Sequence, residues 1–267
     1  MLSIVAKDIH VEFPIYDTRM RSLKYSLGIK HIAKGISGIT AKKWSVGAQI
    51  GSGETGRIVI KALDGVSLEI GEGDRIGLLG HNGSGKTTLL RTLAGIYEPA
   101  SGTIQTSGRV FPLFDLQLGM DPDATGLENI WLRGTMLGLT NKQIKDALDD
   151  VTEFTELGEY MHMPIRAYST GMALRLAFAI STAITPEILI LDEMIGAGDA
   201  AFIARANARL KGFLARTGIL ILASHSTAML RQWCNKAILL EQGKVAASGP
   251  LDDIISIYES KVAAGKG

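Results

Sequence analysis

The chain has 267 residues, of which 46% are hydrophobic and 21% charged, and its formal net charge is +1. This composition supplies an apolar core and excludes a disordered chain, and the near-zero charge provides no overall attraction to nucleic acid. Cys234 is the single cysteine, which excludes a disulfide framework and any zinc or iron–sulfur site built from several cysteines. We therefore expect a protein of the cytoplasm.

The sequence shows no transmembrane segment. Its longest apolar runs, such as residues 188–191 and 219–223, have the length of strands, whereas a bilayer requires about 20 apolar residues. Lys7 and Asp8 interrupt the N-terminus where a secretory signal would remain apolar. The chain is expected to be soluble or peripheral to a membrane.

A strand is predicted over residues 2–13, and the composition then changes. Residues 14–60 contain eight lysines and arginines against the two acids Asp17 and Glu54, and so carry a net charge of +6. Glycines divide this insertion into turns and short pieces. Two interpretations stay open: a solvated loop, or a basic element that faces anionic lipid head groups or a phosphorylated lipid-linked substrate.

From Ile58 onward, apolar strands alternate with helices. Buried apolar strands in such an alternation are typical of a parallel α/β sheet. The expected strands cover residues 58–70, 75–80, 101–114, 187–192 and 218–224, and the expected helices cover 85–97, 127–162, 172–185 and 200–216.

A phosphate-binding loop follows the strand at 76–79. Residues 80–87 fit the pattern G-x-x-x-x-G-K-[ST] and open a helix, which is the context that this motif requires. Its glycines permit close backbone approach, and successive N–H groups at a helix start surround a polyanion. Lys86 would neutralise the β- and γ-phosphates, and the Thr87 hydroxyl would ligate Mg²⁺. The residues expected to contact ATP here are Gly80, His81, Asn82, Gly83, Ser84, Gly85, Lys86, Thr87 and Thr88.

Carboxylates end the strand at 188–192. Asp192 would hold Mg²⁺ through water, and Glu193 would orient or deprotonate the attacking water as a catalytic residue. His225 closes the next strand, and a parallel sheet should place it at the same edge as Asp192. We expect His225 to contact the γ-phosphate during catalysis, although a solitary histidine is more often structural.

The segment Tyr168-Ser169-Thr170-Gly171-Met172 stands before a helix and 24 positions ahead of Asp192. The order of phosphate loop, Ser-x-Gly turn, Asp-Glu strand end and histidine resembles the ABC ATPase cassette. That resemblance implies a RecA-like core, an antiparallel β subdomain and an inserted α-helical subdomain. It also implies a head-to-tail homodimer, in which Ser169, Thr170 and Gly171 contact the ATP held by the partner subunit.

Further cassette positions follow from the same resemblance. Gly198-Asp199 is similar to the D-loop, with Gly198 in place of the commoner leucine, and Asp199 is carried over as a nucleotide-site residue. Phe13, with Tyr16 as its alternative, stands where the family stacks an aromatic ring on adenine; an ordinary core residue is the other interpretation of Phe13. Gln117 is expected in the Q-loop as a ligand of Mg²⁺ and water, with Asp115 as a rival on spacing.

The run YSTGMALRLAFA departs from the common LSGGQ and resembles ATP-binding subunits of polysaccharide exporters. The resemblance implies a peripheral ATPase at the cytoplasmic face of the membrane. Its partners would be a two-fold permease and a lipid-linked polysaccharide, O-antigen first or capsule, with teichoic acid as an alternative. One cassette is expected over residues 1–258, with the insertion at 14–60, a helical subdomain at about 115–180 and a tail at 259–267. A carbohydrate-binding domain after the cassette is not expected.

Three other classes of protein predict features that differ from this sequence. A transporter of drugs, peptides or nutrients predicts a plain LSGGQ and no long insertion. A non-transport ABC protein of ribosomes or DNA usually needs two cassettes or coiled-coil arms. A kinase or GTPase would lack the Tyr-Ser-Thr-Gly-Met turn and the terminal histidine.

Overall fold

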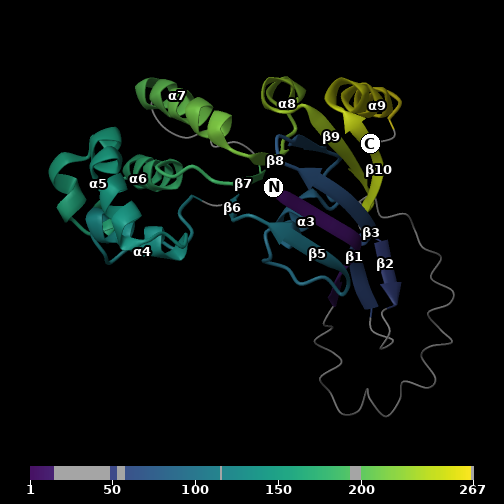
Figure 1. Cartoon of the computed structure of the whole chain (residues 1–267), viewed down its shortest axis with the longest axis horizontal. Helices are drawn as coiled ribbons and strands as arrows, with labels where there is room; N and C mark the ends of the chain where they lie inside the picture. The colour runs from purple at the N-terminus through teal and green to yellow at the C-terminus, as the bar shows by residue number, and fades with distance from the viewer. Residues whose placement is uncertain (15–48, 53–57, 115, 193–199, 266–267) are drawn as a thin grey trace, which may run out of the picture. The chain divides into compact units, whose positions relative to one another are not determined.

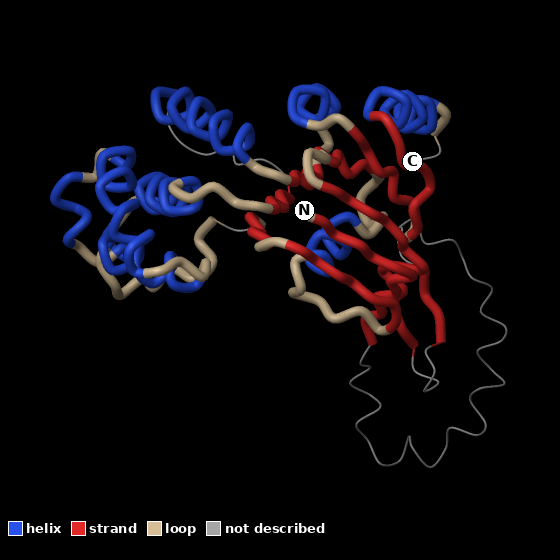
Figure 2. The backbone as a smooth tube through the Cα atoms, in the orientation of Figure 1, coloured by secondary structure: helices blue, strands red, loops and turns tan. Residues whose placement is uncertain are grey.

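The structure is a computed structural model that describes residues 1–14, 49–52, 58–114, 116–192 and 200–265 (Figures 1 and 2). It divides into two compact units. The first comprises Met1–Ser3, Ile70–Gly77 and Thr106–Lys236, and the second Ile4–Glu69, Leu78–Gln105 and Ala237–Gly267.

The described strands form two sheets, with the orders β2-β3-β1-β5 and β10-β9-β4-β8-β7-β6. The strands are β1 (Ser3–Pro14), β2 (Gln49–Ser52), β3 (Ile58–Gly71), β4 (Arg75–Leu79), β5 (Ser101–Ser107), β6 (Val110–Leu113), β7 (Ile188–Asp192), β8 (Ile219–Ala223), β9 (Lys236–Glu241) and β10 (Lys244–Pro250). The helices are α3 (Lys86–Leu93), α4 (Gly126–Met136), α5 (Asn141–Thr155), α6 (Thr170–Thr182), α7 (Ala200–Arg216), α8 (Thr227–Trp233) and α9 (Leu251–Ala263), with 3₁₀ turns η3 (Gly158–His162) and η4 (Ile165–Ala167). Among these described helices, none combines the length and the apolar character needed to cross a bilayer.

In the first unit, β6, β7 and β8 run parallel. Their register pairs Leu113 with Leu191, Leu191 with Leu222, and Asp192 with Ala223. Residues 188–191 and 219–223 are buried, as the expectation of fully apolar strands required. The carboxyl ends of the three strands therefore meet at one edge of the sheet.

A helical group, α4 to α6, belongs to the same unit (Figure 1). Capping boxes start two of its helices, Thr125 with Glu128 at α4 and Thr140 with Gln143 at α5. Apolar side chains spaced along the three helices and η3 then pack into one core. That core contains Ile130, Ile144, Val151, Leu157, Met161, Leu176, Ala179 and Ile180.

The second unit holds α3, α9 and the sheet β2-β3-β1-β5, in which β2 pairs antiparallel with β3. In this unit α9 packs along β10 (Figure 1). The predicted strands and most predicted helices are confirmed. The helix predicted over 85–97 was wrong at its C-terminal end, because Gly95 takes a left-handed φ of 73° and α3 ends at Leu93. Ile96 consequently lies 51% exposed instead of on the buried helix face.

The domain limits drawn from the sequence stay predictions. The helices α4 to α6 lie at Gly126–Met136, Asn141–Thr155 and Thr170–Thr182, near the predicted subdomain. The limit drawn at residue 258 falls inside α9, which continues to Ala263.

Candidate functional site

The phosphate loop needs glycine at two positions for steric reasons. Gly80 has a φ of 147° and Gly85 a φ of 104°. A Cβ atom at Gly80 would stand 2.4 Å from the carbonyl oxygen of Leu240, and one at Gly85 would stand 2.7 Å from that of Ala62. Both contacts involve backbone atoms that cannot yield cheaply, so any larger residue would displace the loop.

Lys86 lies within the curve of this loop. Its Nζ donates hydrogen bonds to the carbonyl oxygens of Gly80 (2.6 Å) and His81 (3.0 Å). The following helix, α3, has no acidic residue in its first turn, and its N-cap, Gly85, has no side chain that could cap it. The first N–H groups of α3 and the ammonium group of Lys86 therefore make an anion site. Its backbone curve requires glycine at positions 80 and 85, and this arrangement of donors fits a polyphosphate.

The remaining loop residues are placed as follows. Asn82, Gly83 and Thr87 are exposed, and His81 is half-buried with its Nδ1 2.8 Å from the carbonyl oxygen of Asn82. The backbone N–H of Ser84 donates to the carbonyl oxygen of His81 (3.1 Å), and the Ser84 hydroxyl is buried. Thr88 accepts a hydrogen bond from the Thr92 hydroxyl through its carbonyl oxygen (2.7 Å). The exposed Thr87 hydroxyl is accessible to a metal ion.

In the first unit, the common edge of β6, β7 and β8 carries three of the predicted residues. Asp192 is the last residue of β7 and is half-buried. Its register partner on β8 is Ala223, and His225 lies exposed two residues after Ala223. Gln117 is exposed four residues beyond the end of β6. The expectation that His225 and Asp192 follow neighbouring strand ends at one edge is confirmed by this register.

The Ser-x-Gly turn forms the N-terminus of α6 in the same unit. Ser169 is the N-cap, and its hydroxyl accepts a hydrogen bond of 3.2 Å from the backbone N–H of Met172. Ser169 and Thr170 are exposed, and a Cβ atom at Gly171 would meet nothing nearer than the Ser169 hydroxyl oxygen at 3.9 Å. Behind them, Tyr168 donates a hydrogen bond of 2.6 Å to the carbonyl oxygen of Tyr160, and burial raises the pKa of Tyr168. The Ser-x-Gly turn is thus an exposed helix N-terminus, and the hydrogen bond of Tyr168 to Tyr160 anchors the residue that precedes it.

Phe13 lies near the end of β1 and is 36% exposed, which excludes the interpretation that it is an ordinary core residue. Its ring meets the Tyr97 ring edge-on, with centroids 5.4 Å apart. The Tyr97 hydroxyl in turn accepts a hydrogen bond of 2.8 Å from Arg91 on α3. Phe13 is therefore a partly exposed aromatic ring that packs against one hydrogen-bonded tyrosine.

Five positions considered from the sequence lie outside the described residues. They are Tyr16, Asp115, Glu193, Gly198 and Asp199.

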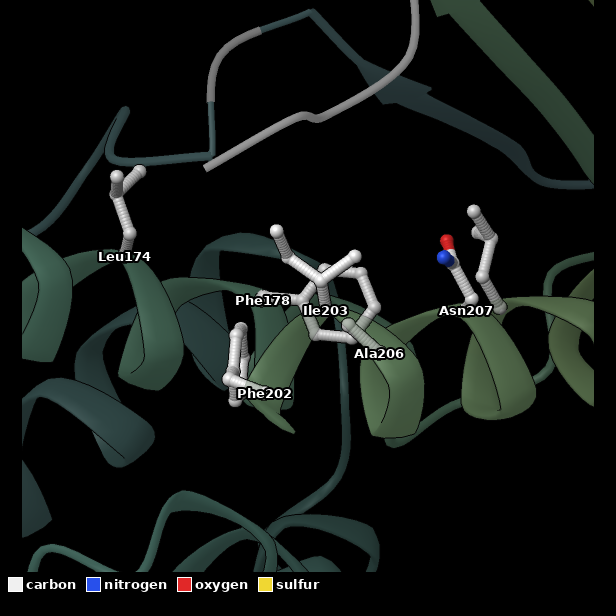
Figure 3. A pocket seen from close by; sticks show the side chains of 7 residues that line it. Leu174, Phe178, Phe202, Ile203, Ala206 and Asn207 are labelled. Carbon is white, nitrogen blue, oxygen red and sulfur yellow. The ribbon is translucent and has the colours of Figure 1, made fainter. Parts of the chain in front are cut away.

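An apolar pocket lies between α6 and α7 (Figure 3). Its lining side chains include Leu174, Phe178, Phe202 and Ile203, with Asn207 as the polar member. None of its lining residues is ionisable, so it offers no charged group to the phosphates of a nucleotide. Elsewhere, burial raises the pKa of the Cys234 thiol to about 12, which makes that residue a poor nucleophile.

Comparison with known proteins adds to this geometry. The sequence pattern of the ABC transporter family matches residues 63–196. The O-antigen export system ATP-binding protein RfbE of Yersinia enterocolitica is 39% identical over 245 residues, which are 92% of this chain and 97% of that protein. The chain belongs to the ABC transporter family. It carries the ATP-binding cassette of that family, with ATPase activity.

Other relatives of this ABC cassette differ in cargo. The teichoic acids export ATP-binding protein TagH of Bacillus anthracis is 36% identical over 74% of this chain and 36% of that protein. Among solved structures, an ATP-binding subunit of an ABC transporter superposes with a TM-score of 0.64 at 19% identity, covering 96% of this chain and 93% of that one. The ADP- and phosphate-bound dimer of the cassette MJ0796 superposes with a TM-score of 0.62 at 17% identity, covering 93% and 98%. These structures establish the cassette fold.

The sequence did not reveal Arg133, a buried residue of α4 that contacts the residues immediately before and after Gln117. Its Nη1 donates to the carbonyl oxygens of Leu116 and Leu118, the latter at 2.9 Å. Arg133 is 4% exposed, so this part of the cassette holds a nearly dehydrated guanidinium group. In the sequence Arg133 stands three positions after Ile130, on the helix face that also carries the buried Gly126, Asn129 and Gly134. It was missed because a charged residue is ordinarily expected at the surface.

Proposed function

We propose that this cassette is the ATP-hydrolysing subunit that powers export of a lipid-linked polysaccharide through a separate permease, with O-antigen as the first candidate cargo and capsule as the second. One observation carries the proposal. The chain is 39% identical along 92% of its length to an O-antigen export system ATP-binding protein, and it covers 97% of that relative. A relative matched from end to end supports a shared task more strongly than one matched over a core motif alone.

ATP would be held by the residues that the cassette resemblance carries over to this chain. The phosphate loop, 80–88, would surround the phosphates, and Phe13, or Tyr16 as its alternative, would stack on adenine. Mg²⁺ would be held by Thr87, Asp192 and Gln117, with Asp115 as the rival of Gln117, and would neutralise charge on the phosphates. The exposed hydroxyl of Thr87 and the half-buried carboxylate of Asp192 are the oxygen ligands that this ion prefers.

For hydrolysis we assign two roles. Glu193 orients the attacking water and takes its proton, and His225 donates a hydrogen bond to the γ-phosphate. The exposure of His225 and its position beyond β8, next to the strand that ends at Asp192, support its part.

The cassette would act as a homodimer. Ser169, Thr170 and Gly171 would complete the partner's ATP site, and Asp199 would lie at the same interface. The N-terminus of α6 supports this role because the Cβ position of Gly171 has no neighbour nearer than 3.9 Å, so an anion can approach the first-turn N–H groups that the Ser169 hydroxyl does not cap. ATP binding would then close the dimer, and hydrolysis would reopen it.

A permease at the cytoplasmic face of the membrane would dock on the helical region 115–165. Large apolar side chains are exposed on and near α4, which supports a protein contact there. They are Leu118, Trp131, Leu132, Met136, Tyr160 and Met163. Residues 14–60 would face lipid head groups or the lipid-linked glycan, so replacing Lys24, Lys30 and Lys34 by Ala should lower export more than ATPase activity.

The deciding experiment is a substitution in the native host. Glu193→Gln should remove surface glycan and trap lipid-linked polymer inside the cell, whereas the matched change Glu259→Gln, at an exposed position of α9, should leave export intact. Unchanged surface glycan in cells that contain the ATPase-inactive Glu193→Gln protein would overturn the glycan assignment.

Teichoic acid is the alternative to O-antigen and capsule, because teichoic acids export ATP-binding proteins are 36% and 37% identical to this cassette. Chemical analysis of the polymer trapped by Glu193→Gln separates the two. A poly(polyol phosphate) chain would identify teichoic acid, and a phosphate-free repeating glycan would identify O-antigen or capsule.

A further inference from the structure

The turn between β9 and β10 contacts the backbone of the phosphate loop. The backbone N–H of Gly243 donates a hydrogen bond of 2.9 Å to the carbonyl oxygen of Ser84, in the middle of the loop. The carbonyl oxygen of Gly243 accepts one of the same length from the N–H of Asp64 on β3. One glycine therefore links the loop to a strand that precedes it in sequence.

The fit at this turn depends on missing side chains. Gly243 has a φ of 79°, and a Cβ atom there would stand 2.7 Å from the carbonyl oxygen of Ala62. A Cβ atom at Gly85 would stand 2.7 Å from this same carbonyl oxygen of Ala62. It would also stand 3.5 Å from the Cα atom of Gly243. Three backbone segments thus meet directly, without side chains between them, because two of them carry glycine.

Two ion pairs tie down the flanks of the turn. Lys261 on α9 lies 2.6 Å from the carboxylate of Glu241, the last residue of β9. Lys244, the first residue of β10, lies 2.9 Å from the carboxylate of Asp64. The residue on each side of the Gln242-Gly243 turn is therefore bonded to another element of the same unit.

We propose that Gly243 is a positioning residue for ATP, and that the β9–β10 turn, fastened to α9 through Glu241 and Lys261, fixes the shape of the phosphate loop. The carbonyl oxygen of Ser84 is held by Gly243, and the N–H of Ser84 donates to the carbonyl oxygen of His81, so the first N–H groups of α3 would be left for the phosphates. The loop is thereby preorganised, so nucleotide binding does not bear the cost of ordering it. This inference rests on the proposed use of the loop for ATP.

The test is nucleotide affinity of the purified full-length chain, measured with a fluorescent ATP analogue and with ADP. Gly243→Ala should raise both dissociation constants at least tenfold, because the added Cβ pushes the turn from Ala62 and breaks the bond to Ser84. The KM for ATP should rise by the same factor, and kcat should fall less than threefold. Gly73→Ala is the matched control, since Gly73 has a similar φ of 86° and nothing within 4 Å of its Cβ position.

Equal affinities of Gly243→Ala and Gly73→Ala would overturn the proposal, even if both lower the melting temperature. If Gly243→Ala does not fold, Lys261→Met replaces it and should weaken binding two- to fivefold. Its control is Lys236→Met, which breaks an ion pair with Asp74 of the same length, 2.6 Å. Equal affinities of these two variants would also overturn the proposal. Lys86→Ala separates the failure of this inference from the failure of the proposed function. If nucleotide binding survives Lys86→Ala, then the loop itself does not bind ATP, and the proposed function fails together with the role of Gly243.

Discussion

The Nη2 atom of Arg133 on α4 donates a hydrogen bond of 3.0 Å to the hydroxyl of Ser181 on α6. The same guanidinium group binds the carbonyl oxygens of Leu116 and Leu118, on either side of Gln117. A side chain that is 4% exposed thereby joins the Gln117 segment to the helix that starts at the Ser-x-Gly turn. Buried backbone carbonyls need such partners, because they have lost their hydrogen bonds to water.

Replacing this guanidinium should be costly. Arg133→Met keeps much of the side-chain volume but leaves two carbonyl oxygens without their donor, and should lower the free energy of unfolding by about 2–3 kcal/mol. Ser181→Ala should lower it by only about 1 kcal/mol, since it removes one acceptor. Urea unfolding measures both values. An Arg133→Met protein as stable as the wild type would contradict the role assigned to this residue.

Phe13 provides a test of adenine stacking. Phe13→Ala should weaken ATP binding by an amount equivalent to about 1–3 kcal/mol, or roughly 5- to 150-fold, and should weaken GTP binding similarly because stacking tolerates any base. Tyr97→Phe is the control, since it keeps the ring beside Phe13 and removes only the hydrogen bond from Arg91. Normal binding by Phe13→Ala together with a loss in Tyr16→Ala would assign the stacking role to Tyr16.

Ser169 is both a helix cap and a proposed contact to the partner's ATP, and the two roles can be separated. Ser169→Ala should cost about 1 kcal/mol of stability through the lost N-cap, leave ATP binding by the isolated chain within twofold, and lower ATPase activity at least tenfold. Thr140→Ala removes the N-cap of α5 at a similar cost and should leave ATPase activity unchanged. A similar loss of ATPase activity in both variants would mean that Ser169 acts only as a cap.

Asp64 predicts a pH dependence of stability. The hydrogen bond from Lys244 holds the pKa of Asp64 below its usual value. A depressed carboxylate pKa stabilises the folded state above the unfolded-state pKa, and this contribution is lost as the pH falls through the folded-state pKa. Lys244→Met should therefore be less stable than the wild type at pH 7, and the difference should shrink toward pH 3. Lys145→Met, at an exposed position of α5, should show no such trend; a Lys244→Met difference that stays constant between pH 7 and pH 3 would contradict this assignment.

Much of the cassette could be predicted because its signals are local. The phosphate loop is a continuous run between a strand and a helix, and its glycines report backbone angles that no other residue adopts easily. The apolar runs at 188–191 and 219–223 identified β7 and β8, since only strands buried on both faces are apolar throughout. The end of α3 was missed because Ile96 continues the helical spacing of apolar residues beyond Gly95, where the backbone turns left-handed.

Residue order and local chemistry predicted the nucleotide site and identified the family of this chain, because each motif lies within about ten residues. Only the tertiary structure decided which distant groups contact these candidate segments: Arg133 meets the residues flanking Gln117, Tyr97 meets Phe13, and Gly243 meets Ser84, the last pair 159 positions apart. Periodicity reveals which face of an element is apolar but not which backbone carbonyl it will meet. Those pairings depend on how segments far apart in the chain pack together, where each buried polar group must find a partner.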